Sequence, residues 1–249
     1  MGFPLITAHS GCEQTERDSM ESVDRAVALG ADAVEMDVRQ VDGVLVVSHN
    51  ALTAAESRGK PSLEEVFLRL KGTGLRLNCD IKEPYALYAV LNMAARHGFG
   101  PQRLILTGSV SPEQIARAPF ITKAAAVFLN VEELLKLLYI HRLRGGEAAR
   151  LPDLLCAPWP FLQGAAMDGE GMDSFLEMVK ALGVSGINMP YKLLTPALAA
   201  ALREEGIPFS LWTVNDPREM DRCIRLGAAN ITTLAVSAAL ERRRWRRGA

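Results

Sequence analysis

The sequence has few cysteines, and their spacing excludes two common kinds of small-protein architecture. Only four occur in 249 residues, at Cys12, Cys79, Cys156 and Cys223, and no two of them form a C-x-x-C pair. A disulfide framework or a thiolate zinc site needs closer, patterned cysteines. We therefore expect four reduced thiols and a cytoplasmic location.

An excess of one charge and a long apolar run are also lacking. The 28 basic and 29 acidic residues leave a formal net charge of -1, which gives no reason to expect nucleic acid as a partner. No run of about eighteen uninterrupted apolar residues offers a membrane span, and the first residues lack the basic and apolar regions of a signal peptide. We expect neither an integral membrane segment nor a cleaved leader.

One local exception to this charge balance is the stretch from Arg242 to Arg247, which holds five arginines and Trp245. One interpretation is a solvated last helical turn, because basic residues are favoured at the C-terminal end of a helix. The other is a weak contact between this tail and an anionic membrane surface.

Strand-like and helix-like periodicities alternate along the chain in about eight pairs. With 49% hydrophobic residues, the chain is long enough for one large core. This pattern predicts a single domain over residues 1–249 of the α/β class, a (β/α)8 TIM barrel with parallel strands inside and helices outside. Residues 145–171, rich in proline and glycine, interrupt the pattern and are expected to form a lid or a packing arm.

Two acids dominate the second predicted strand, Ala33 to Arg39. Glu35 and Asp37 are two residues apart, so they lie on the same face of a strand, whereas Met36 between them faces the other way. Two carboxylates on an inward face repel each other unless a cation lies beside them. Barrel lysines or arginines can supply that charge; the alternative is a hard ion, Mg2+ or Ca2+, which prefers oxygen ligands.

Two of the four histidines close strand-like runs near these acids. His9 follows the first strand, and His49 follows the run that begins after the Asp42-Gly43 turn. A single histidine in such a place is more often a packed core residue, but two beside an acid pair are typical of a general acid and a general base.

Five motifs follow one another along the chain: His9-Ser-Gly, Glu35-Met-Asp37, His49-Asn50, Asp80-Ile-Lys82 and Trp212-Thr-Val-Asn215. In order and spacing, this set resembles the glycerophosphodiester phosphodiesterase family. The related spider-type phospholipases D share the two histidines and the three acids.

The resemblance implies an enzyme of lipid metabolism that hydrolyses a small-molecule glycerophosphodiester to an alcohol and glycerol 3-phosphate. It implies a divalent metal, Mg2+ or Ca2+, on Glu35, Asp37 and Asp80, with Lys82 as a further positive contact for the phosphate. His9 is then the expected base and His49 the expected acid, although the two roles can be exchanged.

The last motif implies a substrate-binding role for Trp212 as a pocket wall and for Asn215 at the rim. A core tryptophan with a capping asparagine is an equally good interpretation of the same residues.

Several positions depart from the family pattern. Ser10 stands where the family has an arginine that contacts phosphate, so we expect a weaker substrate contact from its hydroxyl. Arg17-Asp-Ser-Met20 replaces the usual Glu-Asn-Thr, and Asn50 replaces an aspartate. Two alternatives therefore stay open: a phospholipase D-like enzyme acting on a phospholipid head group, and a non-catalytic barrel that binds a phosphorylated ligand.

Overall fold

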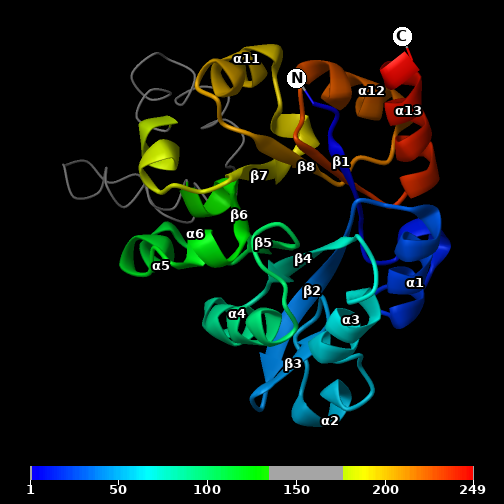
Figure 1. Ribbon diagram of the computed structural model, residues 1–249, viewed down its shortest axis with the longest axis vertical. Coiled ribbons are helices and arrows are strands. Elements are labelled where there is room, and N and C mark those ends of the chain that lie inside the picture. Colours follow the sequence, from blue (N-terminus) through cyan, green and yellow to red (C-terminus); the bar gives the residue numbers. More distant parts are fainter. Residues whose placement is uncertain (1, 135–175, 249) are drawn as a thin grey trace.

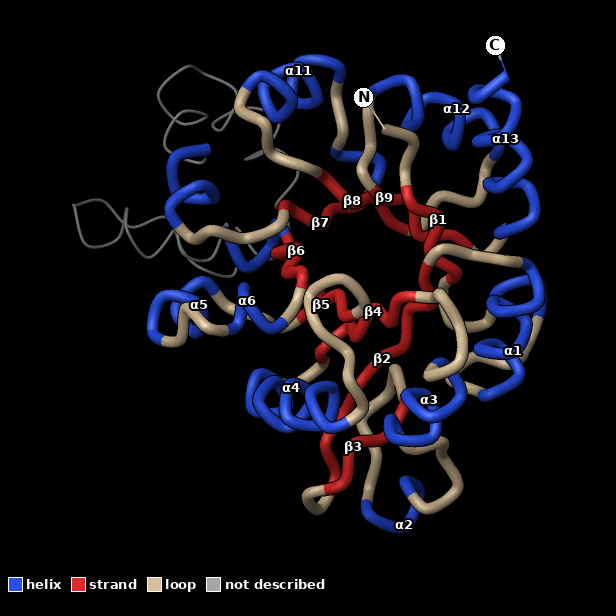
Figure 2. The backbone as a smooth tube through the Cα atoms, in the orientation of Figure 1, coloured by secondary structure: helices blue, strands red, loops and turns tan. Residues whose placement is uncertain are grey.

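The computed structural model describes residues 2–134 and 176–248, and in this range the chain forms a closed barrel surrounded by helices (Figure 1). Strand β1 pairs in parallel with both β2 and β9, which closes the ring. Figure 2 shows the parallel strands as an inner ring, with the helices outside it. The predicted TIM barrel is confirmed. The predicted excursion at 145–171 lies outside the described residues.

The barrel strands run parallel to one another, and β3 is an antiparallel extension paired with β2. The strands are β1 (Leu5–Ala8), β2 (Ala33–Val41), β3 (Val44–Val47), β4 (Arg76–Ile81), β5 (Leu104–Gly108), β6 (Ala126–Asn130), β7 (Gly186–Pro190), β8 (Phe209–Trp212) and β9 (Asn230–Thr233).

The helices that cover the barrel are α1 (Met20–Leu29), α2 (Ala54–Ser57), α3 (Leu63–Leu70), α4 (Leu87–Arg96), α5 (Pro112–Arg117), α6 (Ile121–Ala124), α11 (Pro196–Glu204), α12 (Pro217–Leu226) and α13 (Val236–Gly248). Short 3-10 turns lie at η1 (Cys12–Gln14), η2 (Pro84–Ala86) and η3 (Tyr191–Leu193). Residues 131–134 and 176–181 are also helical.

Local sequence explains where several helices begin. Ser62 and Ser111 cap α3 and α5, each accepting a hydrogen bond from the backbone N–H three residues on, while the side chain at that third position reaches back to the cap. Asp216 caps α12, and Gly227 ends it in a left-handed conformation. These caps fix the residues at which the helices begin and end.

A helical turn over Ile121–Ala124 directly precedes β6, which begins at Ala126. Ile121 is fully buried, and packing of this turn decides its conformation over the local β propensity.

The arginine-rich end is not uniformly solvated. Arg243 is buried, and its guanidinium donates to the carbonyl of Pro4 at 3.1 Å and to the carboxylate of Asp32. Arg242 pairs with Asp221 at 3.1 Å, whereas Trp245 is 73% exposed. At least Arg243 therefore joins α13 to the start of the barrel. Among the described helices, none is both long and apolar enough to cross a bilayer.

Candidate active site

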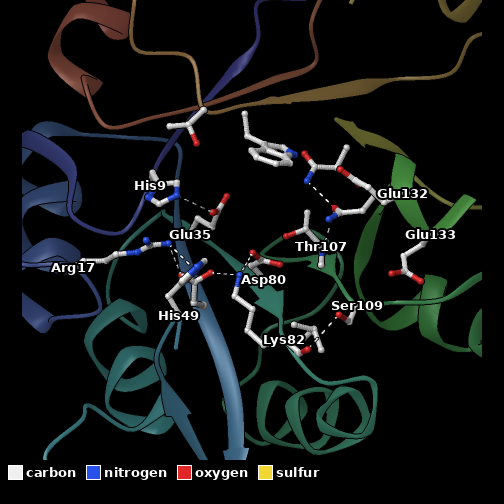
Figure 3. A pocket seen from close by; sticks show the side chains of 17 residues that line it. His9, Arg17, Glu35, His49, Asp80, Lys82, Thr107, Ser109, Glu132 and Glu133 are labelled. Atoms are coloured by element: carbon white, nitrogen blue, oxygen red, sulfur yellow. Dashed lines mark hydrogen bonds and ion pairs between the residues drawn. The ribbon is translucent and has the colours of Figure 1, made fainter. Parts of the chain in front are cut away.

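A cavity of about 380 Å3 opens where the carboxyl ends of the barrel strands meet (Figure 3). Parallel strands in a closed barrel bring their following loops to one mouth, so residues far apart in sequence converge there. The cavity is lined by His9, Arg17, Glu35, Asp37, His49, Asp80, Ile81, Lys82, Thr107, Gly108, Ser109, Asn130, Glu132, Glu133, Asn188, Trp212 and Thr213.

Three carboxylates form the floor of this cavity. Asp37 on β2 is directly opposite Asp80 on β4 in the strand register, and Glu35 lies on the same face of β2, two residues before Asp37. One oxygen from each of the three acids lies within 4.8 Å of the others. Oxygen donors at this spacing fit a hard divalent ion, with Glu35, Asp37 and Asp80 as its protein ligands.

The electrostatics of Glu35 also fit a cation. Its side chain is only 12% exposed, and burial together with the nearby Asp80 and Asp37 carboxylates raises its pKa to about 8. The side-chain amide of Asn78 donates to Glu35 at 3.2 Å, and Thr107 in turn donates to Asn78 at 3.1 Å. This hydrogen-bond chain fixes the carboxylate without neutralising it, so a bound cation would relieve the repulsion.

Lys82 neutralises part of the acidic cluster. Its Nζ lies 2.6 Å from both Asp37 and Asp80. Burial lowers the pKa of Lys82, but the two carboxylates outweigh it and raise the pKa above its ordinary value. Burial likewise acts to raise the pKa of Asp37, yet Lys82 and the other cations nearby hold it below the ordinary value. A divalent ion on all three acids would share Asp37 and Asp80 with this ammonium group.

His9 is oriented as a neutral imidazole. Its Nδ1 lies 2.7 Å from the Ser10 carbonyl, which can only accept, so Nδ1 carries the proton. Nε2 then has the free lone pair, and it lies 3.8 Å from Glu35 on the cavity side. Burial lowers the pKa of His9. This tautomer and protonation state suit a general base.

His49 is held at its main chain and at its ring. Asp18 accepts a hydrogen bond from the His49 backbone N–H at 2.8 Å, and Arg39 donates to the His49 carbonyl at 2.7 Å. Arg39 is itself paired with Glu83. The imidazole Nδ1 lies 3.0 Å from an Asp37 carboxylate oxygen and 2.8 Å from Arg17 Nη2, which can only donate, so Nδ1 accepts and the ring proton is on Nε2. The half-exposed ring can therefore serve as a proton donor at the cavity edge.

Polar side chains on β5, β6 and β7 form the opposite wall. Asn130 accepts hydrogen bonds from the Asn188 side chain at 2.9 Å and from the Gly108 backbone at 3.3 Å. Gly108 has φ +81°, and a Cβ there would overlap Asp80. Glycine at this position therefore lets Asp80 turn toward the other acids.

Most of the residues predicted from the motifs meet in this cavity, but two do not. Trp212 lines the wall, and its buried indole N–H has no hydrogen-bond partner in the described ranges. Asn215 instead accepts from the Leu234 backbone at 2.9 Å and from Thr233, which fixes the loop after β9. Ser10 is 2% exposed and is bonded to Asp18, away from the lining.

Sequence reasoning missed Arg17 and Gly108. Arg17 lies in the β1–α1 loop, and its Nη2 is 3.0 Å from Asp37 and 2.8 Å from His49. No periodicity predicts where a loop side chain points. The two-residue period of a strand does place Asn78 on the face of Asp80 and Lys82, and the structure adds its hydrogen bond to Glu35.

Comparison with known proteins supports the resemblance seen in the motifs. Residues 9–93 match the model of the glycerophosphoryl diester phosphodiesterase family, and this range holds both histidines, the three acids and Lys82. No curated protein matches the sequence.

Solved structures of low identity share the fold. A glycerophosphodiester phosphodiesterase from Parabacteroides distasonis is 20% identical, with a TM-score of 0.68 over 99% of this chain and 100% of that one. The Thermotoga maritima glycerophosphodiester phosphodiesterase is 21% identical, with a TM-score of 0.67 over 97% and 99%. A phosphodiesterase of Oleispira antarctica, in complex with the product sn-glycerol-3-phosphate, is 14% identical, with a TM-score of 0.68 over 96% of each chain.

Proposed function

We propose that this barrel, a phosphodiesterase by its family pattern and fold, hydrolyses a glycerophosphodiester to glycerol 3-phosphate and an alcohol with the help of a divalent ion. The observation that carries the proposal is the convergence of three carboxylates, a lysine and two differently held imidazoles on one cavity. Metal-ligating acids and an acid/base pair are what diester hydrolysis requires.

Charge is the first obstacle to this reaction, because a phosphodiester monoanion repels nucleophiles. A divalent ion held by Glu35, Asp37 and Asp80 would supply positive charge for a phosphoryl oxygen. Lys82, which lies between Asp37 and Asp80, adds a fixed ammonium on the same side of the cavity. The acids therefore favour binding of an anion indirectly, through the cations that they hold.

Proton transfer is assigned to the two histidines. His9 Nε2 accepts the proton from the attacking hydroxyl as its oxygen bonds to phosphorus, and His49 gives a proton to the alcohol oxygen as its bond to phosphorus breaks. Each such transfer contributes roughly two to four powers of ten in rate.

The attacking hydroxyl belongs either to water or to the neighbouring glycerol carbon. In the second case a cyclic phosphate forms first, and a water molecule then opens it. Both routes consume one water and yield the same products.

The substrate-binding role of Trp212 remains part of the proposal. Its ring forms a wall for the substrate's alcohol, and the unpartnered N–H is available as a donor. Ser10 and Asn215 would act indirectly, since both bond to loop backbone at the edge of the site.

The choice between Mg2+ and Ca2+, the cytoplasmic location and the weak membrane contact of the Arg242–Arg247 tail stay predictions from sequence. The free thiols of Cys12, Cys79 and Cys223 agree with a reducing compartment. The exposed Trp245 agrees with an interfacial contact.

The direct test is release of glycerol 3-phosphate from glycerophosphocholine and glycerophosphoethanolamine, with Mg2+, Ca2+ or Mn2+ and with EDTA. We expect turnover that depends on the metal and is lost in His49→Ala. His97→Gln is a matched control, because His97 lies outside the cavity, paired with Glu64. Lysophosphatidylcholine belongs in the same panel, since its cleavage alone would favour the phospholipase D-like alternative. Absence of turnover in a folded sample would favour a binding role.

A further inference from the structure

We infer that Arg17 binds the phosphate group of the substrate, an inference that rests on the proposed function. The sequence has serine where the resembling family has its phosphate-binding arginine, yet the cavity still contains a guanidinium. It comes from a position seven residues further along the chain, in the β1–α1 loop.

The loop that carries Arg17 is fixed by Ser10. The Ser10 hydroxyl accepts a hydrogen bond from the Asp18 backbone at 2.7 Å and lies 3.2 Å from the Asp18 carboxylate. The same carboxylate accepts from the backbone of His49. The Ser10 hydroxyl is therefore bonded to Asp18, the residue directly after Arg17. In this way the small buried side chain at position 10 helps to position the arginine at position 17.

The guanidinium has the charge, position and free donors for an anion. Figure 3 shows Arg17 reaching across from the α1 side toward His49 and the acids. Both of its side-chain hydrogen bonds use Nη2, and in the described ranges Nε and Nη1 have no protein partner. The side chain is 46% exposed and lines the cavity. An arginine with several free donors can hold two phosphate oxygens at once.

The position of Arg17 also places the anion correctly. Its contact with Asp37 puts the guanidinium beside a proposed metal ligand, and its contact with His49 puts it beside the proposed proton donor. A phosphate bound by Arg17 on one side and by Lys82 on the other would have its departing oxygen near His49. The competing interpretation is that Arg17 only neutralises Asp37 and never touches the substrate.

The two interpretations differ in phosphate affinity. We would measure binding of inorganic phosphate by calorimetry, and KM and kcat for glycerophosphocholine, for wild type, Arg17→Ala and Arg17→Lys. Loss of a hydrogen-bonded charged contact is expected to weaken phosphate binding and raise KM about tenfold to a hundredfold in Arg17→Ala. Arg17→Lys keeps the positive charge but not the planar set of N–H donors, so its phosphate affinity and KM should lie between those of wild type and Arg17→Ala. Arg225→Ala, an exposed arginine on α12, is the matched control and should bind as wild type.

The outcomes separate this inference from the proposed function. Wild-type phosphate affinity and KM in folded Arg17→Ala overturn the role of Arg17 and leave the hydrolase proposal intact. Phosphate binding that depends on Arg17 without turnover of any diester supports Arg17 and counts against hydrolysis. A wild type that does not bind phosphate overturns the inference as well. If Arg17→Ala does not fold, Arg17→Lys and Arg17→Gln give the same comparison.

Discussion

Replacing Glu35 with glutamine should stabilise the metal-free protein at neutral pH and weaken the proposed binding of a divalent ion. Burial and the two neighbouring carboxylates raise the pKa of Glu35 to about 8, from an ordinary value of 4.5. The folded state therefore keeps a proton that the unfolded chain releases. The stability that this group contributes is complete below pH 4.5 and is lost as the pH rises through about 8.

The size of the effect follows from the difference in pKa. Each pH unit above the ordinary value costs about 1.4 kcal/mol, so the metal-free fold is destabilised by about 3 kcal/mol at pH 7 and about 4 kcal/mol at pH 8. Glutamine has the same shape, and its carbonyl can still accept the hydrogen bond from Asn78. The difference in free energy of unfolding between Glu35→Gln and wild type should therefore increase by about 3 kcal/mol from pH 5 to pH 8.

Urea denaturation in EDTA at the two pH values measures this gain. Glu204→Gln, an exposed glutamate at the end of α11, is the control and should show no such change. In a second arm, a saturating divalent ion should stabilise wild type by about 3 kcal/mol at a hundred times its Kd, and should stabilise Glu35→Gln far less. If the free energies of unfolding of the two proteins differ equally at both pH values, the electrostatic account is refuted. If the divalent ion stabilises Glu35→Gln as much as wild type, the role of Glu35 as a metal ligand is refuted.

Three further predictions concern the same cavity. Burial lowers the pKa of His9, and a general base must be neutral, so kcat/KM should begin to fall on the acid side of its pH profile at a midpoint below the ordinary histidine pKa of about 6.5. A midpoint above that value would contradict the assignment of His9 as the base. Gly108→Ala should lower the free energy of unfolding by roughly 1–3 kcal/mol and reduce metal-dependent turnover, because its Cβ would displace Asp80. Gly72 has open space around it, so Gly72→Ala should change neither. Thermal melting and kinetics of the two variants test this difference. Lys82→Gln should lower kcat by about a hundredfold through loss of a fixed positive charge, and a wild-type kcat would show that this ammonium does not act on the reaction.

Local sequence was enough to predict the barrel and much of its cavity. The alternation of strand-like and helix-like segments determines the layer arrangement, since each pattern buries one face. Glu35 and Asp37 were placed together correctly because the two-residue period of a strand is a local property. His9, Asp80 and Lys82 lie at or just after the ends of parallel strands, whose carboxyl ends must meet at one edge, and the antiparallel β2–β3 hairpin returns His49 to Asp37.

Only the tertiary structure decided where the side chains of the loops point. Ser10 turns away from the cavity to hold Asp18, and Asn215 turns to the loop after β9, because each finds its hydrogen-bond partner there. Arg17 reaches the cavity, although position 10 carries serine, through contacts with residues twenty and thirty-two positions away. Strand periodicity fixes a side chain's direction from its neighbours in sequence, whereas a loop residue takes its direction from contacts that form only when the chain has folded.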